Sequence, residues 1–252
     1  MKQWLTRYGG PPGQARFRLF CFPFAGASSV VYARWASLFR PAIEIRAVEL
    51  PGRWRRIDEP TIGSVDAIVE NVTQAMLPLL DLPYGLYGHS FGGLLGFECV
   101  RRVRQLGYPL PRFLAAGASK APGLPLRQPP LHLLPDKEFL DACARRYGAV
   151  DERLLEDAEM RAMIVRSMRA DLTALETYAH RAEPPLACPI MIFGARGDAS
   201  VTEQDLDSWA QHTLGPFFIE HFDDGHLFHS AWARALPARL GEAIAAATTG
   251  DD

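Results

Sequence analysis

The chain has 252 residues, of which 48% are hydrophobic and 22% are charged, and its formal net charge is −2. This composition supports one substantial core and gives no indication of a nucleic-acid partner, so we expect a single domain over residues 1–252. No apolar run approaches the roughly 20 residues that span a bilayer, and the N-terminal residues lack the apolar core of a signal peptide, so we expect a soluble, cytoplasmic protein that binds no membrane.

The four cysteines are Cys21, Cys99, Cys143 and Cys188. They form no C-x-x-C pair and no Cys/His cluster with the spacing of zinc ligands. Free cysteines are usually buried, so we expect four buried, reduced thiols and no metal site.

Short apolar segments alternate with amphipathic segments along most of the chain. The predicted strands cover residues 16–22, 43–50, 113–118, 190–193 and 217–222, and a further short strand ends at Leu86 and Tyr87. The predicted helices cover residues 64–80 and 93–106, and a last helix opens at His229 and runs through Ile244. Such alternation predicts an α/β fold with a mostly parallel central sheet and helices on both faces.

Residues 122–185 interrupt this alternation, because no strand is predicted among them. A loop rich in proline and leucine over 122–135 precedes predicted helices over 136–146 and 152–180. We interpret the segment as a helical lid insertion that gates access to a site. Its flexible Met160, Met163 and Met168 are candidates for lining an acyl pocket, and ordinary packing within the lid is the alternative.

The most specific motif is Gly-His-Ser-Phe-Gly over residues 88–92, which fits the G-x-S-x-G pattern. A predicted strand precedes it and a predicted helix follows it. In this setting the serine lies at a sharp, strained turn, and the flanking glycines let neighbouring backbone pass without a Cβ clash. Ser90 is therefore the predicted nucleophile.

A serine hydroxyl needs a base to take its proton, and His226 is the best candidate because it lies in a turn after the last predicted strand. The other six histidines are weaker candidates. His89 adjoins the serine, His132 and His180 fall in the insertion, and His212, His221 and His229 lie in or beside the last strand and helix.

Asp198 is predicted to orient the imidazole, because it lies in a loop after the strand at 190–193. The order Ser90, Asp198, His226 is that of α/β-hydrolases. Asp223 and Asp224 are rivals, but their closeness to His226 makes a role in shaping its turn the simpler interpretation.

A tetrahedral oxyanion needs backbone donors. One should be the N–H of Phe91, the residue after the nucleophile, and the other should come from the loop after the first predicted strand. In that loop Ala25 is our first choice and Phe24 the second, and Phe24 is also a candidate substrate contact.

These residues resemble the type II thioesterases that accompany polyketide and nonribosomal peptide synthetases. The resemblance runs over nearly the whole chain and rests on motifs at residues 21–27 (CFPFAGA), 50–53 (LPGR), 88–93 (GHSFGG), 145–148 (RRYG) and 169–171 (RAD), together with Gly194, Asp198 and Gly225-His226. A departure is Asp224, which stands where the family often has a glycine.

The resemblance implies an α/β-hydrolase fold and a stand-alone editing enzyme. Such enzymes release stalled or wrong acyl groups from the phosphopantetheine arm of acyl or peptidyl carrier proteins through an acyl-serine intermediate. No cofactor is implied beyond the phosphopantetheine of the substrate, and we expect a monomer. A medium- or long-chain fatty acyl-carrier thioesterase, a general carboxylesterase and an acyltransferase or cyclase remain open alternatives.

Two basic clusters offer a possible docking surface for an acidic carrier protein, although solvated faces explain them as simply. One surrounds Trp54 and the other lies in the helix after the serine: Arg53, Arg55 and Arg56, and Arg101, Arg102 and Arg104.

Overall fold

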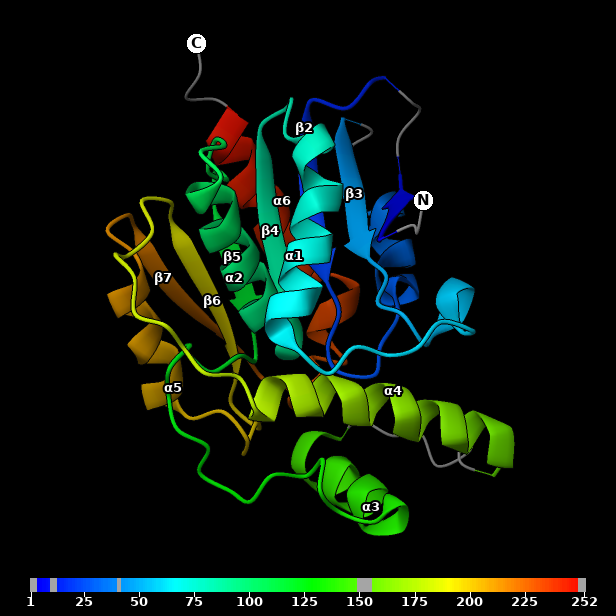
Figure 1. The fold of residues 1–252 in the computed structure, drawn as a ribbon. Helices are drawn as coiled ribbons and strands as arrows, with labels where there is room; N and C mark the ends of the chain where they lie inside the picture. Colours follow the sequence, from blue (N-terminus) through cyan, green and yellow to red (C-terminus); the bar gives the residue numbers. More distant parts are fainter. Residues whose placement is uncertain (1–3, 10–12, 40–41, 149–155, 249–252) are drawn as a thin grey trace.

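The computed structural model describes residues 4–9, 13–39, 42–148 and 156–248 (Figure 1). The strands are β1 (Leu5–Tyr8), β2 (Phe17–Phe22), β3 (Ile43–Val48), β4 (Tyr84–His89), β5 (Leu114–Gly117), β6 (Ile190–Ala195) and β7 (Phe217–Phe222). The α-helices are α1 (Val65–Met76), α2 (Phe91–Gln105), α3 (Asp136–Tyr147), α4 (Ala158–Glu176), α5 (Glu203–Asp207) and α6 (Ala235–Thr248). Short 3-10 helices are η1 (Ser29–Ser37), η2 (Trp54–Arg56), η3 (Leu77–Leu79), η5 (Ser208–His212) and η6 (Ala231–Ala233).

The seven strands form one sheet in the order β1-β3-β2-β4-β5-β6-β7. Only the edge strand β1 is antiparallel to its neighbour, and every other pair is parallel. The predicted mostly parallel sheet is therefore confirmed. The sequence did not predict β1, whose four residues are too few to show an alternating pattern.

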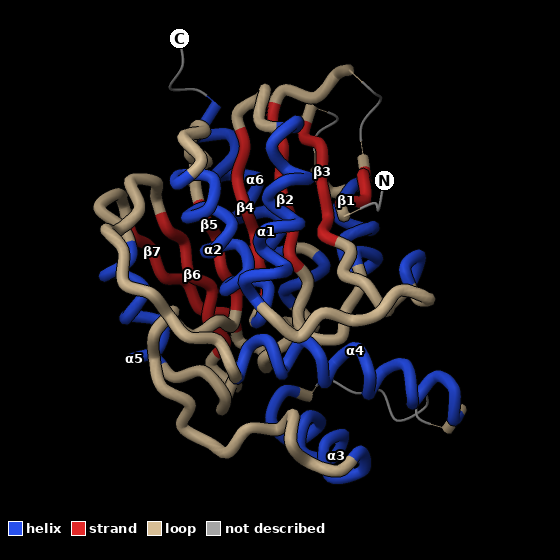
Figure 2. The backbone as a smooth tube through the Cα atoms, in the orientation of Figure 1, coloured by secondary structure: helices blue, strands red, loops and turns tan. Residues whose placement is uncertain are grey.

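Helices cover both faces of the sheet, as predicted (Figure 2). Successive residues of a strand point to opposite faces, so Phe20 and Phe22 of β2 pack with α1 and α2. Leu19 and Cys21 of the same strand instead pack with η1 and α6. All four cysteines are buried and free, as expected. In the part of the chain that the structure describes, no helix is long and apolar enough to cross a membrane.

The helices α3 and α4 lie across the carboxyl edge of the parallel strands, beneath the sheet in Figure 1. Both belong to the chain between β5 and β6, where the helical insertion was predicted. The predicted helix over 152–180 corresponds to α4, and residues 152–155 lie outside the described residues. This edge of the sheet is consequently covered by helices that are not part of the strand–helix alternation.

The prediction that His229 opens the last helix is wrong, because α6 begins at Ala235. Phe228 adopts a φ of 52°, a left-handed conformation that cannot continue into a helix. The Asp224 carboxylate then accepts hydrogen bonds from the backbone N–H groups of Ser230 and Ala231 at 2.7 and 3.0 Å. A turn and the short helix η6 therefore separate β7 from α6.

One buried carboxylate links the three strands at the β1 edge. Glu44 of β3 accepts hydrogen bonds from Arg7 of β1 at 2.6 Å, from Arg18 of β2 at 2.9 Å and from Arg46 at 2.8 Å. Only 5% of Glu44 is exposed. Burial by itself raises the pKa of Glu44, but the three guanidinium groups outweigh it and lower the pKa to about 2.

Because the folded-state pKa of Glu44 lies below its unfolded value, its contribution to stability is complete above pH ~4.5 and is lost as the pH falls toward 2. We expect Glu44→Gln to lower the free energy of unfolding by about 2 kcal/mol at pH 7 and by clearly less at pH 3. Urea denaturation at both pH values measures this. The control is Glu242→Gln, which removes an exposed pair with Arg239 and should have little effect. An equal loss at both pH values for Glu44→Gln would contradict the electrostatic explanation.

Candidate active site

Ser90 lies in the turn between β4 and α2, where the sequence places it. Its backbone has φ 52° and ψ −114°, a conformation that residues with a side chain rarely adopt. The turn is held by a hydrogen bond of 2.7 Å from the Ser90 N–H to the carbonyl of Gly117 on β5. The strained turn brings the serine to the carboxyl edge of the sheet.

Glycines make the strained turn possible because backbone segments pass each other without side chains. A Cβ on Gly88 would lie 2.0 Å from the carbonyl oxygen of Gly92, and one on Gly92 would lie 2.1 Å from that of Phe22. Cβ atoms essentially never approach so closely. Strand β4, helix α2 and the end of β2 therefore pack backbone against backbone at this point.

The structure brings Ser90, His226 and Asp198 together. The distance from His226 Nε2 to Ser90 Oγ is 3.0 Å, and that from His226 Nδ1 to Asp198 Oδ2 is 2.7 Å. An ionised carboxylate can only accept, so Nδ1 carries the proton and Nε2 is free to accept from the serine. This is the geometry of a nucleophile, a base and an orienting acid.

Ser200 is a fourth member of this network that the sequence interpretation missed. Its hydroxyl donates to Asp198 Oδ1 at 2.6 Å and lies 3.0 Å from His226 Nδ1, and its N–H also donates to Asp198 Oδ1. Burial by itself raises the pKa of Asp198, but the bonds from His226 and Ser200 more than offset it and lower that pKa. The carboxylate is thus kept ionised.

His89 supports the loop of His226 rather than its ring. Its Nε2 lies 2.7 Å from the backbone carbonyl of His226, so it donates there, and its Nδ1 accepts from the hydroxyl of Tyr87 at 2.9 Å. Burial and the nearby His226 lower the pKa of His89 to about 3. A neutral imidazole therefore holds the His226 backbone.

Among the described residues, neither of the two rival acids bonds to the imidazole of His226. Asp224 accepts from backbone N–H groups of the turn after β7, and Asp223 pairs with Arg196 at 2.9 Å. The interpretation of Asp224 as a residue that shapes the His226 turn is confirmed.

Two cavities meet at the triad. The smaller, of about 20 Å³, is lined by Ser90 and His226 and by residues of the first loop and the insertion: Phe24, Ala25, Tyr147, Met168, Leu172 and Leu227. The larger, of about 560 Å³, also contains Ser90 and His226 and extends between residues 118–128, 175–180 and 199–202. A cavity of this size is typical of small-molecule sites.

The insertion supplies part of the walls of both cavities. The ring of Tyr147, at the end of α3, lies over the His226 ring with centroids 4.9 Å apart. Of the predicted acyl-contacting residues, Phe24 and Met168 line the smaller cavity. Met160 is 38% exposed, and neither it nor Met163 is among the residues lining the two cavities.

The candidate oxyanion donors lie beside the serine, since Phe91 follows it in the chain and Ala25 lines the smaller cavity with it. Phe91 is the first residue of α2, so its N–H has no partner within the helix. The first loop makes a turn in which Ala27 N–H donates to the carbonyl of Phe24 at 3.0 Å, with Gly26 at φ 82°. No partner for the Ala25 N–H is found among the described residues. Both amides are thus available beside Ser90.

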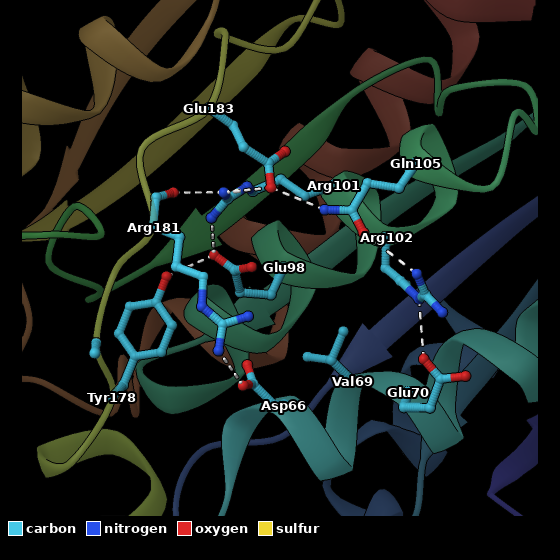
Figure 3. A pocket seen from close by; sticks show the side chains of 11 residues that line it. Asp66, Val69, Glu70, Glu98, Arg101, Arg102, Gln105, Tyr178, Arg181 and Glu183 are labelled. Atoms are coloured by element: carbon cyan, nitrogen blue, oxygen red, sulfur yellow. Dashed lines mark hydrogen bonds and ion pairs between the residues drawn. The ribbon is translucent and has the colours of Figure 1, made fainter.

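Half of the predicted docking arginines are buried. Arg53 and Arg56 are each 5% exposed and Arg101 is 3% exposed. Figure 3 shows Arg101 between Glu98 and Glu183, at 2.6 and 2.7 Å, in a pocket lined by charged side chains of α1, α2 and residues 178–183. Buried, paired guanidinium groups cannot contact a partner, so neither cluster forms a continuous basic surface.

The close backbone packing around the Ser90 turn predicts that alanine substitutions at two glycines of α2 have unequal effects on stability. Gly92→Ala places a Cβ against the Phe22 carbonyl and should lower the free energy of unfolding by at least about 3 kcal/mol. In Gly96→Ala the nearest atom is Leu114 Cδ1 at 3.5 Å, an ordinary contact, so this control should stay within about 1 kcal/mol of the parent. Urea denaturation measures both, and equal stabilities would contradict the packing argument.

The bonds of Ser200 predict that it assists the reactivity of Ser90. Ser200→Ala removes a donor to Asp198, so the pKa of Asp198 should rise, and the rate of Ser90 labelling by a fluorophosphonate should fall about 3- to 10-fold. Ser200→Thr keeps the hydroxyl and should retain most of the rate. Ser208→Ala, which removes a hydroxyl bonded to the Gln204 carbonyl, is the control and should label like the parent. An unchanged rate in Ser200→Ala would exclude this assistance.

The comparisons with known proteins agree on one family. A protein-family model described as a thioesterase domain matches residues 17–246. The gramicidin S biosynthesis protein GrsT of Aneurinibacillus migulanus is 34% identical over 214 residues, covering 85% of this chain and 83% of GrsT.

Solved structures agree as well. RedJ, a thioesterase from the prodiginine biosynthetic pathway in Streptomyces coelicolor, matches with a TM-score of 0.86 at 31% identity, over 93% of this chain and 88% of RedJ. The type II thioesterase BorB from the borrelidin biosynthetic cluster matches with a TM-score of 0.86 at 31% identity, over 96% of this chain and 97% of BorB. The resemblance to type II thioesterases and the α/β-hydrolase fold are thereby confirmed, and the chain belongs to the thioesterase family, a hydrolase family that acts on thioesters.

Proposed function

We propose that this thioesterase removes acyl groups from the phosphopantetheine arms of acyl or peptidyl carrier proteins through an acyl intermediate on Ser90. The observation that carries the proposal is the bonded series Ser90–His226–Asp198, which opens into both cavities. The association of GrsT with gramicidin S biosynthesis and of RedJ with the prodiginine pathway favours a carrier-bound substrate. An editing role, in which stalled or wrong acyl groups are released, is part of this proposal.

In the first half of the reaction, Ser90 Oγ attacks the thioester carbonyl while His226 Nε2 takes the hydroxyl proton. The oxyanion of the tetrahedral intermediate accepts hydrogen bonds from the N–H groups of Phe91 and Ala25. The C–S bond then breaks, and the imidazolium gives its proton to the leaving thiolate. Asp198 stabilises the imidazolium throughout, because its pKa is lowered and it stays ionised.

In the second half, water attacks the acyl-Ser90 ester and gives a proton to His226. The oxyanion forms again at the same two amides. The ester C–O bond breaks, the proton returns to Ser90 Oγ, and the carboxylic acid leaves. These steps use only this chain's side chains, its backbone amides and one water molecule.

The larger cavity is where we place the pantetheine arm. Its volume of about 560 Å³ lies within the range of about 300–1,000 Å³ that small-molecule sites occupy. The residues that surround it come from the sheet edge and from the insertion at 122–185. We propose that this insertion serves as the lid of the site, and that its helices exclude bulk water from the acyl enzyme.

The proposal predicts that Ser90→Ala lowers hydrolysis of an acyl-carrier thioester by at least about 10³-fold and abolishes fluorophosphonate labelling, because the nucleophile is removed. His226→Ala should lose activity to a similar extent. Ser208→Ala is again the matched serine control. Release of carrier thiol and of free acid is measured on a panel of acyl-carrier proteins that differ in chain length and α-branching.

The same assay separates the alternatives. The proposal requires a higher kcat/KM for carrier thioesters than for oxygen esters with the same acyl group. Faster turnover of the oxygen esters would indicate a general carboxylesterase, and transfer of the acyl group to an amine or alcohol in place of water would indicate an acyltransferase. Labelling of the parent at another serine would overturn the assignment of Ser90.

A further inference from the structure

Three motifs of the sequence that the triad does not use meet inside the molecule. Arg53 follows β3 in the L-P-G-R segment, and Asp171 lies on α4 in the R-A-D segment. Both reach the turn at residues 24–27, which carries the candidate oxyanion donor Ala25. The side chains are 5% and 1% exposed, so this junction is sealed from water.

The contacts at this junction involve both carboxylate oxygens. Asp171 Oδ2 accepts from Arg53 Nη1 at 2.5 Å, and Oδ1 accepts from Arg53 Nη2 at 2.8 Å. The same Oδ2 accepts from the backbone N–H of Gly26 at 2.8 Å, and Arg53 Nη1 also donates to the carbonyl of Ala27 at 3.1 Å. A bidentate arginine–carboxylate pair is geometrically specific, so it holds the turn in one orientation.

The bonds act on the two residues that follow the donor. The N–H of Gly26 donates a hydrogen bond to Asp171, and the carbonyl of Ala27 accepts one from Arg53. Ala25 itself lines the smaller cavity together with Ser90. Gly26 adopts φ 82°, and an added Cβ would lie 3.1 Å from Met168 Cε, so the turn also packs tightly against α4. The Ala25 amide is thus aimed by bonds that it does not make itself.

A buried ion pair is weak evidence for stability, because desolvation of the two charges offsets much of their attraction. Stability alone therefore does not explain why this buried ion pair forms hydrogen bonds with the backbone of the turn. Positioning does explain it. An oxyanion donor must be held within a few tenths of an ångström before the charge develops, because reorganisation during the reaction would cancel its benefit.

We propose that Arg53 and Asp171 are positioning residues that hold the Ala25 N–H in place for the oxyanion and tie this donor to α4. The proposal rests on the proposed function, in which Ala25 is an oxyanion donor. It makes α4 a fixed wall of the site, because a shift of this helix would withdraw the acceptor of the Gly26 N–H and release the turn.

The test uses Asp171→Asn, which keeps the size of the side chain, and Arg53→Lys, which keeps its charge, and both break the bidentate pair. Because the oxyanion is absent from the bound substrate and forms only in the tetrahedral intermediate and the transition states beside it, kcat should fall about 10- to 100-fold while KM changes less than about threefold. An alkyl boronic acid, which forms a tetrahedral adduct with Ser90, should bind more weakly by a similar factor. A non-hydrolysable thioether analogue of the substrate should bind as it does to the parent.

The matched control is Arg101→Lys. Arg101 is buried to a similar degree and pairs with Glu98 and Glu183 (Figure 3). None of its bonds within the described part of the chain reaches the turn at residues 24–27. It should lower the melting temperature without changing kcat or boronate affinity by more than about twofold. If Asp171→Asn and Arg53→Lys behave like this control, or weaken boronate and thioether equally, the positioning role is excluded.

A second variant keeps the test decisive if a single change prevents folding. Arg53→Met with Asp171→Leu replaces the pair by apolar side chains and leaves no unpaired charge, which buried sites often tolerate. This double variant should fold and still show the loss of kcat and of boronate affinity. Full activity in it would overturn the proposal. Absence of thioesterase activity in the parent would instead refute the proposed function, and boronate binding would still report on the turn.

Discussion

The proposed chemistry of this molecule depends on the placement of one imidazole ring. His226 is 7% exposed and is held through both ring nitrogens, through its backbone carbonyl by His89 and across its face by Tyr147. The groups that hold the ring come from loops after β4 and β6 and from the end of α3. Parallel strands end at one edge of a sheet, which is why loops so distant in sequence can converge on one ring.

The site is a composite of the sheet edge and the insertion. The sheet edge supplies the proposed nucleophile, base and acid, whereas α3 and α4 supply the Tyr147 ring and the Met168 and Leu172 side chains of the smaller cavity. Without the insertion, the triad would face open solvent on that side, and the electrostatic stabilisation of an oxyanion would be weaker in the higher dielectric of water. The helices of the insertion therefore form part of the wall of the proposed reaction centre.

The arginines show how a buried interaction can be mistaken for a surface. In the sequence, Arg53 and Arg56 stand beside Arg55 and Trp54 and look like a basic patch. In the structure Arg53 pairs with Asp171, and Arg56 pairs with Glu59 and donates to the carbonyl of Glu49. Of these four residues, only Trp54 and Arg55 are exposed. Charge along a chain gives no information on where the partner of each charge lies.

The sequence by itself determined the strained turn at Ser90, the order Ser90, Asp198, His226 of the bonded series and the parallel α/β architecture, because each depends on local spacing, glycine placement or strand–helix alternation. The same local signals could not show β1 or the turn that delays α6 to Ala235. Only the tertiary structure decided that Ser200 reaches the His226 ring, that His89 bonds to a carbonyl 137 residues away, and that Asp171 bonds to Gly26, 145 residues away. A hydrogen bond requires two groups within about 3 Å, and folding alone brings such distant groups together.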